Sequence, residues 1–116
     1  MTKNGAFHAG RAFGESAEPD LPEALAAWER AWESDGVTLF DFLMREGGES
    51  EAHARQFSPF EFLARDLNAS RDPDGAWEAY EAGVEVGLRQ VALAACRTYL
   101  AQVAERVGLP APRRRK

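Results

Sequence analysis

AWEAYEAGVEVGLRQVALAACRTYLAQVAERV, residues 76–107, is the stretch that decides the fold, because it is a long helical pattern without a proline. At 1.5 Å per residue it predicts a rod of about 48 Å. A domain of 116 residues has a diameter of roughly 35 Å. The helix is therefore expected to bend or break at Gly83 or Gly87, or to project and pack on another chain.

Two lanes of residues follow this helix on different sides. In one lane, residues recur every four positions and are mostly small, Gly83, Gly87, Val91 and Ala95. Small residues let a second helix approach closely, either in the core or between subunits. The other lane is apolar and consists of Val86, Leu93, Leu100, Val103 and Val107.

The apolar lane offers more area than one core contact needs, which favours a homodimer or a groove for a partner protein. Phe60 is expected to be largely buried together with Trp77, Tyr80, Val84 and Leu88, in the core or in the interface. The residues predicted to form the partner interface are Trp77, Tyr80, Gly83, Val84, Gly87, Leu88 and Val91, with the carboxylates Glu78, Glu81 and Glu85.

Capping signals place three further helices before this one. Asp20-Leu-Pro-Glu23 predicts a helix over residues 21–34, because an aspartate cap with proline in the first turn satisfies a helix start. Thr38 is expected to begin a short helix that Gly47-Gly48 ends near Glu46. Ser58-Pro-Phe-Glu61 predicts a helix that ends near Asn68, followed by a turn over residues 72–75.

The composition agrees with an all-α protein, since isoleucine is absent and alanine occurs 21 times. We expect one domain over residues 1–112, a small bundle of four to five helices with a long C-terminal helix that can kink at its glycines. Residues 1–19 are expected to form a short helix or an irregular arm. The basic residues 113–116 are expected to be a disordered tail.

The residues that carry common chemistries are nearly absent from the sequence. One cysteine, Cys96, and two histidines, His8 and His53, leave little for a metal site, although Glu49 and His53 would share one face of a helix. No serine stands in a Gly-x-Ser-x-Gly turn, and the glycines do not form a phosphate loop. We therefore expect no enzyme activity, no cofactor and no metal.

Charge and hydropathy narrow the location and the partners. The first residues do not resemble a signal peptide and no stretch is long enough to span a membrane, so a cytoplasmic protein is expected. The net charge of −5 includes four positive charges from Arg113 to Lys116, so the rest of the chain carries −9. An acidic body repels nucleic acid, which makes nucleic acid an unlikely main ligand. The acidic helical faces could also mimic a phosphate backbone and occupy a basic channel of another protein.

One run resembles small uncharacterised helical proteins carried by bacterial phages and plasmids. It comprises Ser58-Pro-Phe-Glu-Phe62, Asn68 and Trp77-x-x-Tyr80-x-x-Gly83, about a quarter of the chain. The resemblance implies an accessory or host-interacting protein, including an inhibitor of a host defence enzyme. The leading hypothesis is thus a non-enzymatic protein that binds a partner protein through acidic and apolar helical surfaces. The alternative is a nucleic-acid accessory protein that uses the basic tail.

Overall fold

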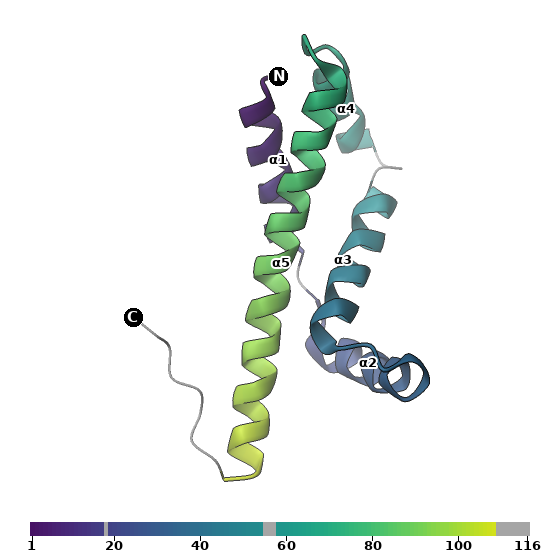
Figure 1. The fold of residues 1–116 in the computed structure, drawn as a ribbon, viewed down its shortest axis with the longest axis vertical. Coiled ribbons are helices and arrows are strands. Elements are labelled where there is room, and N and C mark those ends of the chain that lie inside the picture. Colours follow the sequence, from purple (N-terminus) through teal and green to yellow (C-terminus); the bar gives the residue numbers. More distant parts are fainter. Residues whose placement is uncertain (18, 55–57, 109–116) are drawn as a thin grey trace.

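The computed structural model describes residues 1–17, 19–54 and 58–108, apart from the side chains of residues 50–54, 58 and 59. Across these ranges the chain is all-α, as the sequence predicts, and no strand is present. The helices are α1 (Lys3–Glu15), α2 (Leu21–Asp35), α3 (Leu39–Ala54), α4 (Ser58–Asn68) and α5 (Pro73–Arg106), shown in Figure 1.

Helix α5 is the spine of the molecule. It runs for 34 residues without a break, about 51 Å, in a molecule that measures 56 × 36 × 22 Å. The expected break at Gly83 or Gly87 is absent, and the C-terminal end of α5 projects beyond the other helices (Figure 1). The helix ends at Arg106, and Gly108 follows with a φ of 74°, which suits glycine.

The turn predicted over residues 72–75 is wrong, because this segment is the start of α5. The Asp72 side chain accepts a hydrogen bond from the Gly75 backbone N–H at 3.2 Å, and Pro73 is the first helical residue. An aspartate cap followed by proline satisfies the free donors of a first helical turn. The same two residue types begin turns, so the local sequence alone was ambiguous.

Helix α2 begins at Leu21, as predicted, and ends at Asp35, one residue later than predicted. Its cap, Asp20, accepts a hydrogen bond from the Glu23 backbone N–H at 3.4 Å, and Gly36 ends the helix with a φ of 66°. Trp28 ties the end of this helix to the next segment, because its indole N–H donates to the Val37 carbonyl at 2.7 Å.

Helix α3 begins as predicted but is longer. The Thr38 hydroxyl accepts from the Asp41 backbone N–H at 3.2 Å. The predicted end near Glu46 is wrong, since the helix continues through Gly47 and Gly48 to Ala54. A Cβ on Gly47 would strike the Leu88 side chain. Gly47 therefore serves a close approach to α5 rather than a helix stop.

The remaining predictions on local structure have mixed outcomes. Helix α4 ends at Asn68, as expected. The side chains of Ser58 and Pro59, which were predicted to begin this helix, lie outside the described side chains. The side chain of His53 lies outside them too. Residues 3–15 form helix α1, so the N-terminal segment is a helix rather than an irregular arm. The basic tail lies outside the described residues.

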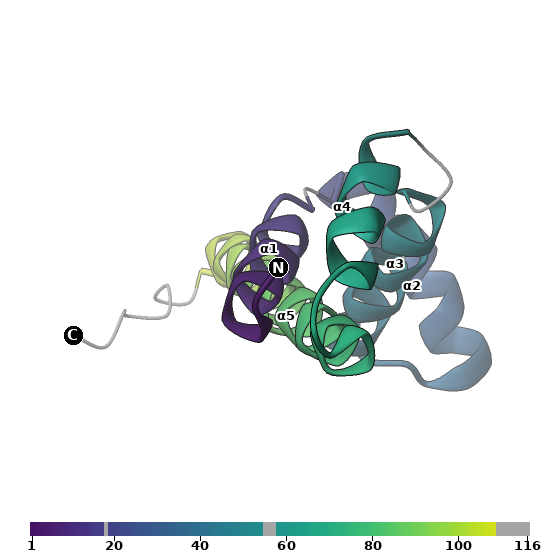
Figure 2. The ribbon, with the colours of Figure 1, turned by 90° about the horizontal axis from the view of Figure 1, so that it is seen from above.

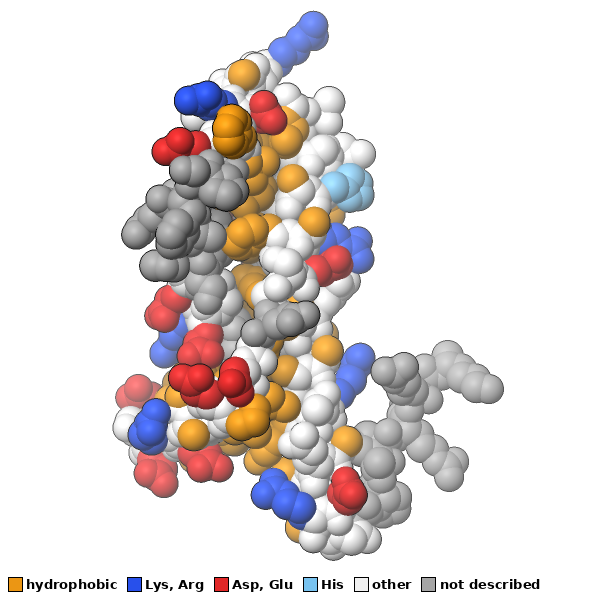
Figure 3. Space-filling model, turned by 180° about the vertical axis from the view of Figure 1, so that it is seen from behind, with side chains coloured by type: hydrophobic (Ala, Val, Ile, Leu, Met, Phe, Trp, Pro, Cys, Tyr) orange, Lys and Arg blue, Asp and Glu red, His pale blue; other side chains and the backbone are white. Residues whose placement is uncertain are grey.

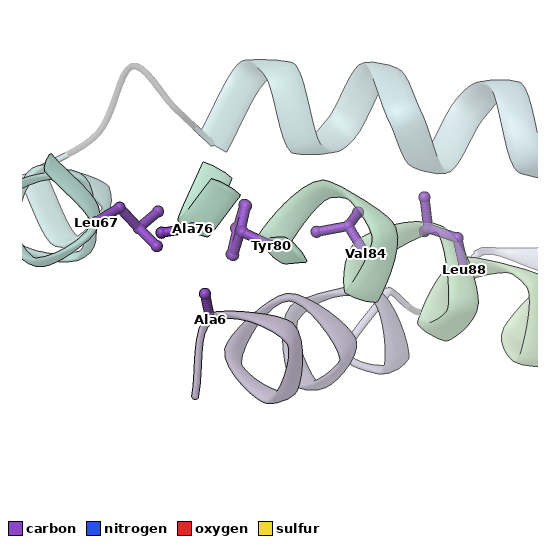
Figure 4. Packing of buried hydrophobic residues seen from close by; sticks show 6 residues of the cluster. All are labelled: Ala6, Leu67, Ala76, Tyr80, Val84 and Leu88. Atoms are coloured by element: carbon purple, nitrogen blue, oxygen red, sulfur yellow. The ribbon is translucent and has the colours of Figure 1, made fainter. Parts of the chain in front are cut away.

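Helix α5 supplies residues to two buried clusters. The first cluster, drawn in Figure 4, contains Ala6 of α1, Leu67 of α4, and Ala76, Tyr80, Val84 and Leu88 of α5. The second contains Ala24 of α2, Leu39 and Leu43 of α3, and Ala92 of α5. One face of α5 thus holds α1 and α4 near its N-terminal end, and α2 and α3 farther along.

Candidate interaction surface on helix α5

The lane of small residues on α5 is occupied by α1 of the same chain. A Cβ on Gly83 would strike the Phe7 carbonyl, and a Cβ on Gly87 would strike that of Arg11. In the opposite direction, a Cβ on Gly10 would strike the Tyr80 carbonyl. Together with Gly14, these glycines let the two backbones touch, and we call the four of them the glycine contact.

The sequence pattern did not predict that α1 packs against this lane. The signal was available, because Gly10 and Gly14 are four residues apart, as are Gly83 and Gly87. Two helices with glycines at the same spacing can bring their backbones together. Glycines are also common in irregular segments, so residues 1–19 alone did not reveal this match.

The apolar residues predicted at the partner interface lie inside the molecule. Tyr80, Val84 and Leu88 are buried, and Trp77 is half-buried beside Phe60, with ring centroids 6.0 Å apart. The Trp77 indole N–H donates to the Asn68 side-chain oxygen at 2.7 Å. These residues hold α4 and α1 on α5, so a partner cannot reach the lane while α1 is docked.

Val91 and the predicted carboxylates lie closer to the surface. Val91 is half-buried and lines a cavity of about 200 Å³ together with Leu43, Glu46 and Leu88. Glu78, Glu81 and Glu85 are exposed. Glu85 accepts a hydrogen bond from the Arg89 guanidinium at 3.3 Å, one turn farther along the helix.

The second lane of the sequence analysis is an exposed stripe on the other side of α5. The exposed fraction of its residues rises along the chain, from 36% at Val86 to 41% at Leu93, 54% at Leu100 and 61% at Val107, which directly follows the last residue of α5. These four residues, spaced by seven, are called the outer stripe below. Val103 is half-buried and borders it. Single exposed apolar residues are normal, whereas several of them along one side of a helix make that side a candidate binding surface.

The other helices leave this side of α5 open. In Figure 2, α1, α3 and α4 lie to one side of α5. No described helix crosses in front of α5 in Figure 1. The glycine contact and the buried clusters account for the covered side. A second helix can therefore lie along the outer stripe without displacing any described element.

Charge along α5 is divided by position. Residues 73–88 contain four carboxylates and no basic residue, whereas residues 89–106 contain Arg89, Arg97 and Arg106 and one carboxylate, Glu105. Within the described part of the chain, Arg97 and Arg106 have no ion-pair partner. The helix is thus acidic in its first half and basic in its second half.

A second charged surface lies over α2. Figure 3 shows carboxylates gathered at the lower left, where α2 and the adjoining end of α3 lie. Helix α2 also carries Trp32, which is 53% exposed. Lys3 and Asp72 form an ion pair of 2.9 Å at the opposite end of the molecule. Asp72 raises the pKa of Lys3, and Lys3 lowers the pKa of Asp72.

The described residues offer few groups for chemistry. No cluster of three or more His, Cys, Asp or Glu side chains that could hold a metal occurs among them. Cys96 is half-buried, and burial raises the pKa of its thiol, which makes the thiolate scarcer. In the part of the chain that the structure covers, no helix is both long and apolar enough to cross a membrane.

Comparison with known proteins gives no match: no family model, no curated protein and no solved structure is similar to this chain.

Proposed function

We propose that the chain is a non-enzymatic interaction protein, which binds a partner protein through the outer stripe of α5 and the charges beside it. The observation that carries this proposal is the line of exposed apolar residues spaced by seven on the uncovered side of α5. Burying such a line is favourable at roughly 25 cal/mol per Å² of apolar area.

The proposal moves the binding surface from the lane of small residues to the outer stripe. Gly83 and Gly87 touch α1, so they act within the chain. Glu85 remains part of the proposed surface, because it is exposed and stands directly before Val86. An accessory or host-interacting role, including inhibition of a host defence enzyme, is compatible with such a surface and remains part of the proposal.

Photo-crosslinking in the cells that encode the protein tests this function. Benzoylphenylalanine at Leu93 would face the bound partner, and the same residue at Thr98 is the matched control, since Thr98 is exposed on a different side of α5. We expect light-dependent adducts at position 93 and few at position 98. Equal yields at the two positions, or none at either, would contradict the proposed surface.

A nucleic-acid accessory role is the second candidate, and the basic second half of α5, which leads into Arg113 to Lys116, favours it. In that case the protein should bind a generic DNA duplex at low salt, and the affinity should fall steeply as salt rises. Truncation after Pro112 should abolish this binding. Binding that survives the truncation would exclude the tail as its source.

A further inference from the structure

The outer stripe supplies one of the two positions that a supercoiled pair of helices fills with apolar residues in each repeat of seven, and Cys96 and Val103 fill part of the other. An α-helix has 3.6 residues per turn, so a line of residues spaced by seven drifts by about 20° per repeat. Two helices that coil around each other keep such a line in contact. The stripe keeps this spacing from Val86 to Val107, about 32 Å of helix. Its natural occupant is another helix with the same spacing.

Helix α5 of a second copy is such a helix, and its charges favour one orientation. In an antiparallel pair, the end of the acidic half of each α5, residues 83–88 with Glu85, lies beside residues 101–106 of the other, which include Arg106. The dipoles of the two helices then also point in opposite directions, which is favourable. A parallel pair would place the two acidic halves side by side, and complementary charge selects the orientation of an interface more than its strength.

We propose that two copies of this chain associate through α5 in antiparallel orientation, with the outer stripe of each copy packed against α5 of the other. This inference rests on the proposed function, because it identifies the partner of the same surface as a second copy of the chain. Each copy keeps its other helices on the far side of its own α5 (Figures 1 and 2), so the two bodies extend in opposite directions from the pair.

The proposed register places apolar residues opposite one another and brings opposite charges together beside them. Val86 lies opposite Val103 of the second copy, and Leu93 lies opposite Cys96 of the second copy. The flanking positions then bring Glu85 next to Arg106 of the second copy. Both of these side chains are exposed in the single chain. Arg89 lies opposite Leu100 of the second copy, where its aliphatic stem covers the leucine and its guanidinium reaches water.

The mass in solution tests the association. Analytical ultracentrifugation of the full chain across a concentration series should give twice the mass of 12.8 kDa. Leu93→Gln together with Leu100→Gln should raise the dissociation constant at least about tenfold while circular dichroism stays unchanged. Phe62→Gln is the matched control, since Phe62 is 69% exposed in α4, and it should leave the mass unchanged.

Distances between spin labels test the orientation. In a Cys96→Ala background, labels at Gln90→Cys in both copies should be offset along the helices by about 14 Å, and labels at Glu105→Cys by about 32 Å. A parallel pair would give the same short distance at the two sites, because equivalent residues then lie level. Equal distances at the two sites would overturn the antiparallel arrangement.

A charge exchange tests the register. Glu85→Lys should weaken association, because it places a lysine beside Arg106 of the second copy, and adding Arg106→Glu should restore it. Glu29→Lys on α2 makes the same change of charge away from the stripe and should have no effect. Failure of the double variant to recover would overturn this register.

The experiments separate this inference from the proposed function. A monomer at every concentration overturns the second copy as partner, while adducts from Leu93 to a different protein would still support the proposed function. A monomer with no adduct from Leu93 overturns both. An adduct of twice the chain mass at position 93 supports both.

Discussion

Gly14 of α1 and Gly87 of α5 meet through their backbones. A Cβ on Gly14 would lie 3.0 Å from the Gly87 Cα, and a Cβ on Gly87 would lie 2.9 Å from the Gly14 carbonyl carbon. Such distances exclude any side chain at either position unless the helices move apart. The contact explains why α5 is unbroken at its glycines: they accommodate a neighbouring helix, and helical packing outweighs their low intrinsic helix propensity.

Replacing Gly87 by leucine should separate α1 from α5. The new side chain would strike backbone atoms of Arg11 and Glu15, which cannot rotate away. We expect the free energy of unfolding to fall by at least about 2 kcal/mol, measured by urea denaturation. Gly48→Leu is the control, since no atom lies within 4 Å of a Cβ at Gly48. Equal losses for the two variants would contradict the glycine contact.

Gly48→Ala should stabilise the protein. Gly48 lies in α3 with open space around it, so alanine adds helix propensity without a clash. The expected gain is about 0.5–1 kcal/mol, measured by thermal unfolding. Gly36→Ala should have the opposite sign, because the φ of 66° at Gly36 is strained for alanine. A loss of stability in Gly48→Ala would show that this part of α3 is not helical.

Removing the Trp28 indole hydrogen bond should weaken the link between α2 and α3. Trp28→Phe keeps a ring but leaves the Val37 carbonyl without its donor, and this bond is partly buried. We expect a loss of about 1 kcal/mol of unfolding free energy. Trp77→Phe is the comparison, since Asn68 is exposed and water can replace the lost donor, so a smaller loss is expected.

The pairing of Lys3 with Asp72 should make stability depend on pH at both extremes. The lowered pKa of Asp72 comes first from its hydrogen bond to Lys3 and then from the Gly75 backbone N–H. Its contribution is present above the unfolded value of 3.8 and is lost as pH falls through the lower folded value. The raised pKa of Lys3 gives a contribution that is present below 10.5 and lost as pH rises through the folded value.

Asp72→Asn checks this assignment, because asparagine keeps the helix cap and removes the titrating group. Stability measured by chemical denaturation from pH 2 to 5 should decline less steeply in this variant than in the original chain. Asp74→Asn, on the next exposed carboxylate, is the control. An unchanged slope in Asp72→Asn would mean that the Lys3 pair is not formed in solution.

Capping residues carried most of what the sequence predicted correctly. Asp20 and Gly36 mark the two ends of α2. These ends could be predicted because the cap hydrogen bond and the backbone angle at the helix end depend on neighbouring residues alone. The end of α3 was missed because Gly47 makes room for the side chain of Leu88, which is distant in the sequence. The placement of α1 was missed for the same kind of reason, since residues 3–15 pack on residues 80–88. Contacts of this kind are visible only once two helices are placed together.

The candidate surface was predicted in part. The spacing of Val86, Leu93 and Leu100 separated them from the core lane, and the structure leaves them exposed. Tyr80 and Val84 also recur at helical spacing, as residues of an interface would, but α1 and α4 bury them. Periodicity shows which residues share a face of a helix, and it does not show which face the rest of the chain covers.

The glycine contact joins a helix near the beginning of the chain to one that is made near its end. Gly14 and Gly87 are separated by the segments that form α2, α3 and α4. At ordinary rates of translation, α1 waits roughly 4 to 14 seconds for the facing part of α5 to be synthesised. Because a helix of this length is marginal alone in water, α1 should gain its structure only when residues 80–88 of α5 are available to pack on it.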